Sequence, residues 1–134
     1  MLNETNQAVL VVDDELAVVT YIADVVEGFF QIPTFKAQSA EAAREIFKKH
    51  GDRITTVISD MSMPSQFGTA LVRELVADRP DVRVIFVTGN LVDEKTVAKL
   101  VGRPVSLLMK PFGPFELKGL LERTAFNTAY EYIV

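Results

Sequence analysis

Five polar side chains follow apolar segments of the chain, and they are of the types that bind metal ions and phosphate. They are Asp13, Asp14, Asp60, Thr88 and Lys110. Three carboxylates in one crevice repel each other, so they must share a cation or raise a pKa. Such an oxygen-only site suits Mg²⁺, which commonly takes one or two carboxylates together with a substrate phosphate. The set therefore predicts phosphoryl chemistry around a bound Mg²⁺ ion.

Within this site Asp60 would act as the nucleophile and form an aspartyl phosphate. The metal ion and Lys110 would neutralise charge on the oxygens of the transferring group, and the Thr88 hydroxyl would bond one of them. Taken alone, each residue has a simpler interpretation, such as a helix cap for Asp14, a turn residue for Thr88 or a surface charge for Lys110. The set is more specific than its members because each follows a predicted strand.

The segments before these residues are short, apolar and rich in β-branched residues, which is typical of buried strands. The predicted strands are residues 8–12, 32–37, 54–59, 82–87 and 105–109. Apolar residues at helical spacing alternate with them. They predict helices from Leu16 to Gly28, over 40–50, 69–79 and 93–101, and from Pro114 onward. Asp14 and Ser39 are placed to cap the first two helices.

Strands that alternate with helices indicate an α/β fold with a parallel sheet between two helical layers. We expect a doubly wound, five-stranded, flavodoxin-like sheet in the order 2-1-3-4-5, which is the order of known folds of this type. The carboxyl ends of all parallel strands lie on one edge of such a sheet. That edge would collect the five polar side chains, with the aspartates at the switch point between strands 1 and 3.

The composition limits the kind of protein further. The chain has 134 residues, which suits one domain, and 49% of them are hydrophobic. It has no cysteine, a formal net charge of -4, no apolar run long enough for a membrane span and no signal-peptide pattern. We therefore expect a cytoplasmic protein that binds neither membranes nor, by itself, nucleic acid. The single histidine, His50, lies in a basic helix end and is interpreted as structural.

Four motifs together resemble the receiver domains of two-component response regulators, over about residues 8–125. The motifs are Val-Val-Asp13-Asp14, Asp60 followed by Met63-Pro64 and Gly68, Val-Thr88-Gly89, and Lys110-Pro111-Phe112. The resemblance implies that Asp60 accepts a phosphoryl group from a sensor histidine kinase or phosphotransfer protein. It also implies a signalling switch rather than an enzyme.

The resemblance further implies which groups surround the phosphoryl group. Mg²⁺ would be bound by Asp14, Asp60 and the backbone carbonyl of Ser62, with Asp13 acting mainly through water. Thr88 and Lys110 would contact the phosphoryl group, and the Lys110–Pro111 bond is commonly cis in such domains. A downstream protein would bind the face built from the fourth helix, fifth strand and last helix. Candidates to report the change on that face are Leu91, Leu107 and Phe115.

The sequence departs from the family pattern at Leu107, where an aromatic residue usually couples to the threonine. Ser62 and Asn90 occupy positions that influence the lifetime of the phosphoryl group in such domains. Phe67, in the loop before Gly68, would be either packed or a partner contact. Residues 1–7 are expected to form a polar extension, 8–125 the receiver domain, and 126–134 a tail that extends the last helix or makes a homodimer contact.

Three other functions stay open. The first alternative is a receiver-like interaction module that works without phosphorylation. Leu107 keeps this alternative open because it replaces the aromatic residue that usually couples to the threonine. The second is an aspartate-nucleophile phosphatase, although Ser62 stands where such enzymes usually have a second aspartate. The third is a flavin-binding protein, although the acidic segment Asp13-Asp14-Glu15 is unsuited to a flavin phosphate.

Overall fold

The computed structural model describes residues 6–63 and 68–126, in which five strands alternate with five helices. The strands are β1 (Ala8–Val12), β2 (Thr34–Ala37), β3 (Ile54–Asp60), β4 (Arg83–Thr88) and β5 (Ser106–Met109). The helices are α1 (Leu16–Phe30), α2 (Ala40–His50), α3 (Gly68–Leu75), α4 (Glu94–Val101) and α5 (Pro114–Leu121). A π-helical segment, η1 (Glu122–Phe126), continues α5.

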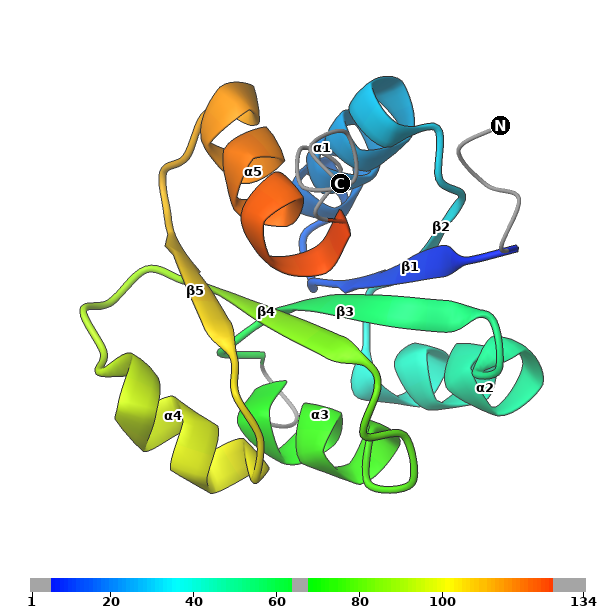
Figure 1. Ribbon diagram of the computed structural model, residues 1–134, viewed down its shortest axis with the longest axis vertical. Helices are drawn as coiled ribbons and strands as arrows, with labels where there is room; N and C mark the ends of the chain where they lie inside the picture. Colours follow the sequence, from blue (N-terminus) through cyan, green and yellow to red (C-terminus); the bar gives the residue numbers. More distant parts are fainter. Residues whose placement is uncertain (1–5, 64–67, 127–134) are drawn as a thin grey trace, which may run out of the picture.

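All four strand pairings are parallel, and the strand order is β2-β1-β3-β4-β5. This confirms the doubly wound, flavodoxin-like fold predicted from the alternation of strand and helix patterns. Figure 1 shows α1 and α5 on one face of the sheet and α2, α3 and α4 on the other. Strand β3 lies in the middle of the sheet, with β1 and β4 on either side. The strand that ends at Asp60 is therefore fully paired.

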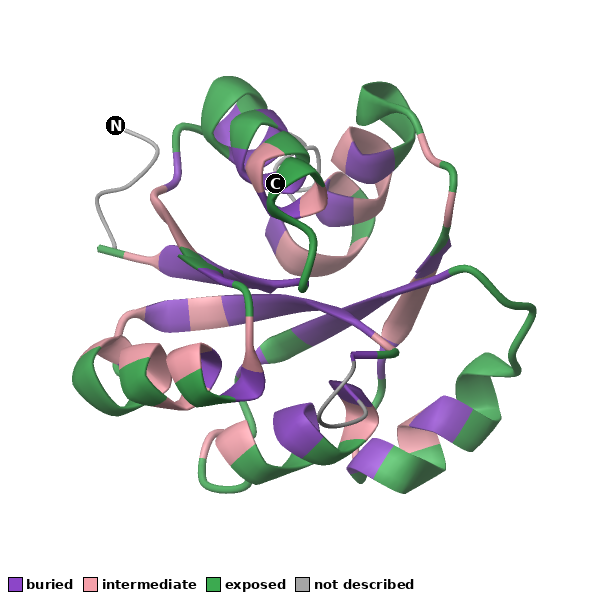
Figure 2. Ribbon diagram, turned by 180° about the vertical axis from the view of Figure 1, so that it is seen from behind, coloured by how far each residue is buried: buried purple, intermediate pink, exposed green. Residues whose placement is uncertain are grey.

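The sheet separates two hydrophobic cores. Val57 packs in the core under α2, α3 and α4, whereas the next residue, Ile58, packs in the core under α1 and α5. This alternation follows from the strand geometry, in which successive side chains point to opposite faces. Strands β1, β3 and β4 are buried along nearly their whole length, the edge strands β2 and β5 only in part, and the outer surfaces of the helices are exposed (Figure 2). Continuous apolar segments were therefore a correct signal for strands covered on both faces.

Several predicted helix ends can be compared with the structure. Ser39 caps α2 as predicted, because its hydroxyl accepts a hydrogen bond from the Ala42 amide at 3.1 Å. The predicted stop at Gly28 is wrong. Helix α1 continues to Phe30, whose ring packs on Phe126 with centroids 4.6 Å apart, and ends at Gln31 in the left-handed conformation. A tertiary contact thus extends the helix by two residues.

The predicted helix over 69–79 is also too long, because α3 ends at Leu75. The chain continues in turns, in which the Arg79 amide donates to the Val76 carbonyl at 2.9 Å. The Arg103 guanidinium binds the carbonyls of Val76, Arg79 and Val82, which gives these groups partners outside a helix. A side chain distant in sequence therefore stabilises the early end of α3.

Some expectations lie outside the described residues or stay predictions. Phe67 and the tail from residue 127 fall outside the described residues, so their predicted contacts are not addressed. The predicted domain boundaries at residues 7 and 125 also remain predictions. Within the described ranges, no helix has both the length and the apolar character needed to span a bilayer.

Candidate functional site

The site is assembled at the carboxyl edge of the sheet, where the predicted residues meet. Asp13 follows β1, Asp60 ends β3 and Thr88 ends β4. Lys110 follows β5, and its amide donates a 2.8 Å hydrogen bond to the Thr88 carbonyl, which ties the ends of β4 and β5 together. The peptide bond between Lys110 and Pro111 is cis, as the resemblance implied. The parallel register therefore brings the chemistry-bearing residues to one edge.

Lys110 lies between two buried carboxylates. Its Nζ is 3.5 Å from Asp13 Oδ2 and 3.8 Å from Asp60 Oδ1. Only 1% of Asp13 and 8% of Asp60 is exposed to solvent. The ammonium group is thus positioned to balance both negative charges at once.

The balance is incomplete. Burial raises the pKa of both Asp13 and Asp60, although the nearby Lys110 ammonium lowers each of them. The negative charge of Asp14 raises both pKa values further, and that of Asp60 also raises the pKa of Asp13. Additional positive charge at this edge would therefore stabilise the ionised carboxylates.

The hydrogen bonds of Asp13 point to the same need. Its Oδ1 accepts from the Glu15 amide at 2.9 Å, whereas its buried Oδ2 has no hydrogen-bond partner within the described part of the chain. The expectation that Asp14 caps α1 is wrong, because Glu15 is the N-cap residue and Asp13 binds its amide. The Asp14 side chain is exposed.

Carboxylate oxygens of Asp13, Asp14 and Glu15 lie within 4.8 Å of one another and could hold a metal ion together. Glu15 was not among the predicted ligands, although its position directly after the two aspartates was a signal for it. Asp60 is not a member of this close group among the described residues. The all-oxygen donor set fits a hard divalent cation such as Mg²⁺, and so does Asp13 Oδ2, which has an ion pair with Lys110 at 3.5 Å but no hydrogen bond within the described residues.

The Ser62 amide donates a 3.4 Å hydrogen bond to Asp60 Oδ1, so the backbone after β3 helps to orient the carboxylate. The proposed use of the Ser62 carbonyl as a metal ligand stays a prediction. Gly68 also supports this region, because an added Cβ would lie 2.0 Å from the Asp60 carbonyl oxygen. The start of α3 can approach Asp60 this closely only without a side chain.

The Thr88 hydroxyl is engaged with the following loop. It accepts from the Asn90 amide at 3.0 Å and donates to the Asn90 carbonyl at 3.1 Å. Leu107, which stands in place of the expected aromatic residue, is half-buried and packs against the core under α3 and α4. To donate to an acceptor group on Asp60, the Thr88 hydroxyl would have to redirect the hydrogen bond that it now donates to the Asn90 carbonyl.

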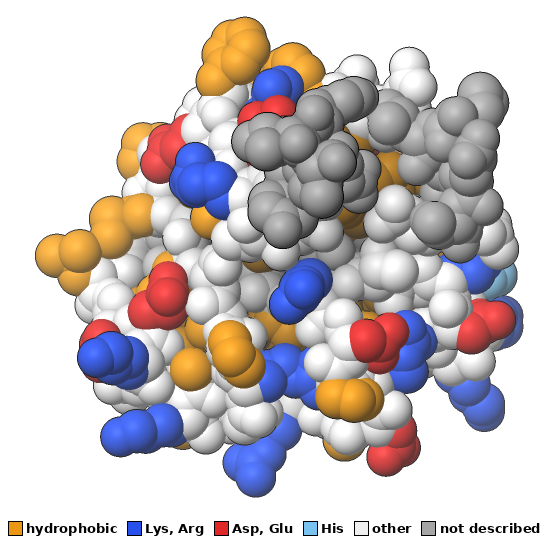
Figure 3. Space-filling view, in the orientation of Figure 1, with side chains coloured by type: hydrophobic (Ala, Val, Ile, Leu, Met, Phe, Trp, Pro, Cys, Tyr) orange, Lys and Arg blue, Asp and Glu red, His pale blue; other side chains and the backbone are white. Residues whose placement is uncertain are grey.

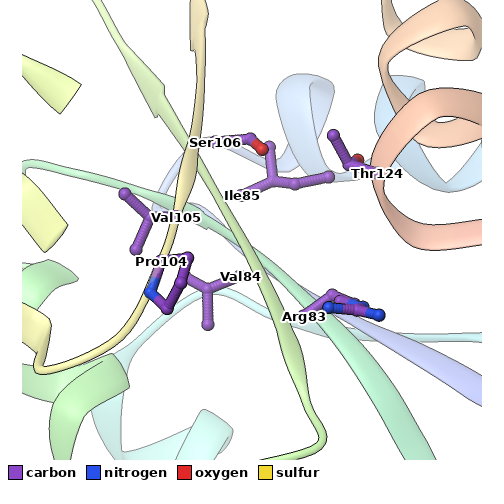
Figure 4. A pocket seen from close by; sticks show the side chains of 7 residues that line it. All are labelled: Arg83, Val84, Ile85, Pro104, Val105, Ser106 and Thr124. Carbon is purple, nitrogen blue, oxygen red and sulfur yellow. The ribbon is translucent and has the colours of Figure 1, made fainter. Parts of the chain in front are cut away.

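One surface cavity lies beside the site, and another lies at the opposite edge of the sheet, where the strands begin. One of about 380 Å³ lies beside Lys110 and is lined also by Glu15, Tyr21 and Phe112 from the start of α1 and the loop before α5. The other, of about 220 Å³, is shown in Figure 4 and is formed by the first residues of β4, by residues 104–106 at the entry to β5 and by Thr124. Because it lies at the starts of the strands, it contains none of the site residues predicted from the sequence.

Comparison with known proteins agrees with this fold and edge. Residues 9–122 match the family model described as the response regulator receiver domain. The match covers most of the chain, so the chain belongs to the response regulator receiver domain family.

Individual relatives are distant. Response regulator SaeR of Staphylococcus aureus is 26% identical over 108 residues, which are 81% of this chain and 46% of that protein. The chain therefore spans about half the length of the curated relatives it matches. Among solved structures, chemotaxis protein CheY4 of Vibrio cholerae aligns with a TM-score of 0.78 and 25% identity, covering 87% of this chain and 97% of that one. A receiver domain protein of Clostridium thermocellum aligns with a TM-score of 0.77 and 25% identity, covering 94% and 98%.

Proposed function

We propose that this receiver domain is a phosphorylation switch in which Asp60 accepts a phosphoryl group from a histidine kinase or phosphotransfer protein. The observation that carries the proposal is the Lys110 ammonium placed within 4 Å of both Asp60 and Asp13. An aspartate at the end of a central strand, with a lysine and further carboxylates around it, suits transfer of a highly charged group. Solvent access at Asp60 is small but not zero, since 8% of the residue is exposed.

In the proposed step an Asp60 carboxylate oxygen forms a bond to phosphorus while the phosphorus–nitrogen bond of the donor's phosphohistidine breaks. The electron pair leaves with the histidine nitrogen, so no redox partner is needed. Lys110 would balance the charge of the new phosphoryl oxygens. Thr88 would bond one of them after releasing Asn90. The single histidine of this chain, His50, stacks on Phe35 with ring centroids 4.5 Å apart and is interpreted as structural, so the phosphohistidine of the proposed step lies outside these residues.

The proposal includes a Mg²⁺ ion held by Asp13, Asp14 and Asp60 with the Ser62 carbonyl, and Glu15 is a further candidate ligand. When bound, the ion would neutralise charge on the transferring group. Asp13 and Asp60 would gain most from it, because burial raises the pKa of both carboxyl groups. Asp14 and Glu15 are exposed, which leaves the ion open to water and to a phosphate oxygen.

The proposed output surface is the face of α4, β5 and α5. Exposed apolar side chains support it, since Leu91, just before α4, is 89% exposed and Met109, at the end of β5, is 40% exposed. Phe115 of α5 is 74% exposed, and its ring packs on Phe29 of α1 with centroids 5.6 Å apart. In Figure 3, hydrophobic side chains project on the side of the molecule where these elements lie. A downstream protein would cover them, or a second copy of the chain would do so. Phosphorylation would shift an existing equilibrium between two conformations of this face. The cytoplasmic location stays a prediction.

The test is incubation with acetyl phosphate and Mg²⁺, followed by mass spectrometry to locate any added phosphoryl group. We expect one Mg²⁺-dependent modification, on the peptide that contains Asp60. Asp60→Asn should abolish it. Asp78→Asn is the matched control, because Asp78 is an exposed aspartate in the turn after α3, and it should leave the modification unchanged.

Modification that persists in Asp60→Asn would refute the assignment of the acceptor. An unmodified protein, under conditions that label another receiver domain, would instead favour the phosphorylation-independent interaction module. The half-buried Leu107 is the observation that favours this second candidate, because the family's usual aromatic partner for the threonine is replaced.

A further inference from the structure

A surface cavity of about 510 Å³ lies between α3 and α4, which are neighbours on one face of the sheet (Figure 1). It is larger than the cavity of about 380 Å³ beside Lys110, and the two share no lining residue. One wall is formed by Met61 after β3 and Thr69 of α3. The other wall follows α4 from the segment before the helix to its last turn and consists of Val92, Asp93, Thr96, Val97 and Leu100.

This lining has the character of a site for a small molecule. Such sites are concave, have volumes of about 300–1,000 Å³ and are mostly apolar, with a few polar groups that orient the ligand. Here the apolar part is made by Met61, Val92, Val97 and Leu100. Leu100 is 54% and Val92 40% exposed, so their side chains would lose contact with water when a ligand enters.

The backbone on the Met61 side of the cavity is already fixed. The Met61 amide donates to the Val87 carbonyl at 2.9 Å, and the Met61 carbonyl accepts from the Gly68 amide at 2.8 Å. A ligand would therefore not have to order this wall when it binds, which lowers the cost of binding. The methionine side chain itself is unbranched and can adapt to the shape of a ligand.

The charged group of the cavity is the Asp93 carboxylate. Asp93 is the N-cap residue of α4, where an aspartate ordinarily accepts a hydrogen bond from an amide of the first turn. Here its side chain makes no such bond and accepts only from the Thr96 hydroxyl, at 3.0 Å. Within the part of the chain that the structure describes, no lysine or arginine forms an ion pair with Asp93. The carboxylate is therefore available to a cation that enters the cavity.

We propose that this cavity binds a small amphipathic amine. Its apolar body would lie against Met61, Val97 and Leu100, and its ammonium group would pair with the Asp93 carboxylate. Charge complementarity selects the class of ligand, because a carboxylate ligand would be repelled by Asp93 and a neutral one would gain no ion pair. The site belongs to the unmodified chain and does not rest on the proposed phosphorylation.

The test is a titration of the unmodified protein with phenethylamine, followed by NMR of the methyl groups. We expect saturable shift changes at Met61, Val97 and Leu100, with a dissociation constant on the order of 10 mM for so small a ligand. Phenethyl alcohol has nearly the same shape without the charge. It should produce changes at the same methyl groups and bind about fivefold more weakly, as the loss of one exposed ion pair predicts.

The variant that tests the charge is Asp93→Asn. It should weaken the binding of phenethylamine about fivefold and leave that of phenethyl alcohol unchanged, so that the two ligands bind alike. Asp24→Asn is the matched control, because Asp24 is an exposed aspartate of α1, on the other face of the sheet. It should leave the binding of both ligands as it is.

Three results would overturn the proposal. An equal loss for the two ligands in Asp93→Asn would assign the effect to the local structure of α4 rather than to charge. Shift changes centred on the signals of Tyr21 and Phe112 would place the amine in the cavity beside Lys110 instead. The absence of saturable changes would show that the cavity does not take a small amine and would leave it to an apolar side chain of a partner protein.

Discussion

Replacement of Lys110 by methionine should destabilise the protein by an amount that depends on pH. At the observed separations of 3.5 and 3.8 Å, each attraction to a carboxylate is about 4 kcal/mol at an effective dielectric constant of about 20. The lysine side chain is 29% exposed, so water screens the pairs and solvates the free ammonium. We therefore expect the free energy of unfolding at neutral pH to fall by about 2–3 kcal/mol when Mg²⁺ is absent.

The sign of the pH dependence follows from the pKa shifts. Burial raises the pKa of Asp13 and Asp60 in the folded protein, and loss of Lys110 should raise both further. Above these raised pKa values both carboxylates are ionised without their cation, so the variant is less stable than the parent. As the pH falls through the raised values, both groups become protonated in the folded state, and the difference between variant and parent should disappear.

The assay is urea unfolding of both proteins in a chelating buffer, from neutral pH down to about pH 4, near the pKa of an unperturbed aspartate. Lys118→Met is the control, because Lys118 is 31% exposed and pairs with a single carboxylate, that of Glu122, at 3.1 Å, while its ammonium lies 5.5 Å from the centroid of the Phe29 ring. Its loss should change the free energy of unfolding by no more than about 0.5 kcal/mol. A loss for Lys110→Met that is equal at both ends of the pH range would refute the charge-based reasoning and assign the effect to packing of the lysine stem.

Two further predictions concern the metal site and the backbone beside it. Added Mg²⁺ should raise the free energy of unfolding by about 1.4 kcal/mol for each tenfold excess over its dissociation constant. In urea titrations Asp14→Asn should lose most of this gain, whereas Glu45→Gln, an exposed control on α2, should keep all of it. Equal gains in the two variants would argue against a site at Asp14. Gly68→Ala should cost about 1–3 kcal/mol, because its Cβ meets the Asp60 carbonyl oxygen, a backbone atom that cannot swing away. Gly28→Ala, where a Cβ meets nothing within 4 Å, should instead stabilise α1 by about 1 kcal/mol, and a destabilised Gly28→Ala would count against this comparison.

The strands and the composition of the site edge could be predicted because they depend on local patterns, whereas the strand order was expected only from known folds of this type. Buried parallel strands are continuously apolar, and a polar residue that follows such a strand must lie at its carboxyl edge. This is why Asp13, Asp60 and Lys110 meet in the structure as the sequence indicated. Ser39 was predictable for a similar reason, because a cap acts within three residues of its own position.

What could not be predicted depends on contacts between distant residues. The extension of α1 past Gly28 follows from the packing of Phe30 on Phe126, which are 96 positions apart, and the early end of α3 coincides with the bonds of Arg103. The wrong N-cap prediction for α1, Asp14 in place of Glu15, concerns two neighbouring residues rather than distant ones. Either acidic residue could begin the helix, and burial of Asp13 beside the Glu15 amide decides between them.

The division of the interior by the sheet has a consequence for how this domain can change over time. Among the described residues, the buried side chains of the α1 and α5 layer form one cluster and those of the α2, α3 and α4 layer form another, so substitutions that repack one layer lie in a different cluster from those that repack the other. Their costs should add, as is usual for separated sites. One layer can thus acquire new surface residues for a new partner while the other accumulates compensating, stabilising changes. Among the described residues, β1, β3, β4 and β5 contribute side chains to both layers, so changes in these strands affect both layers at once.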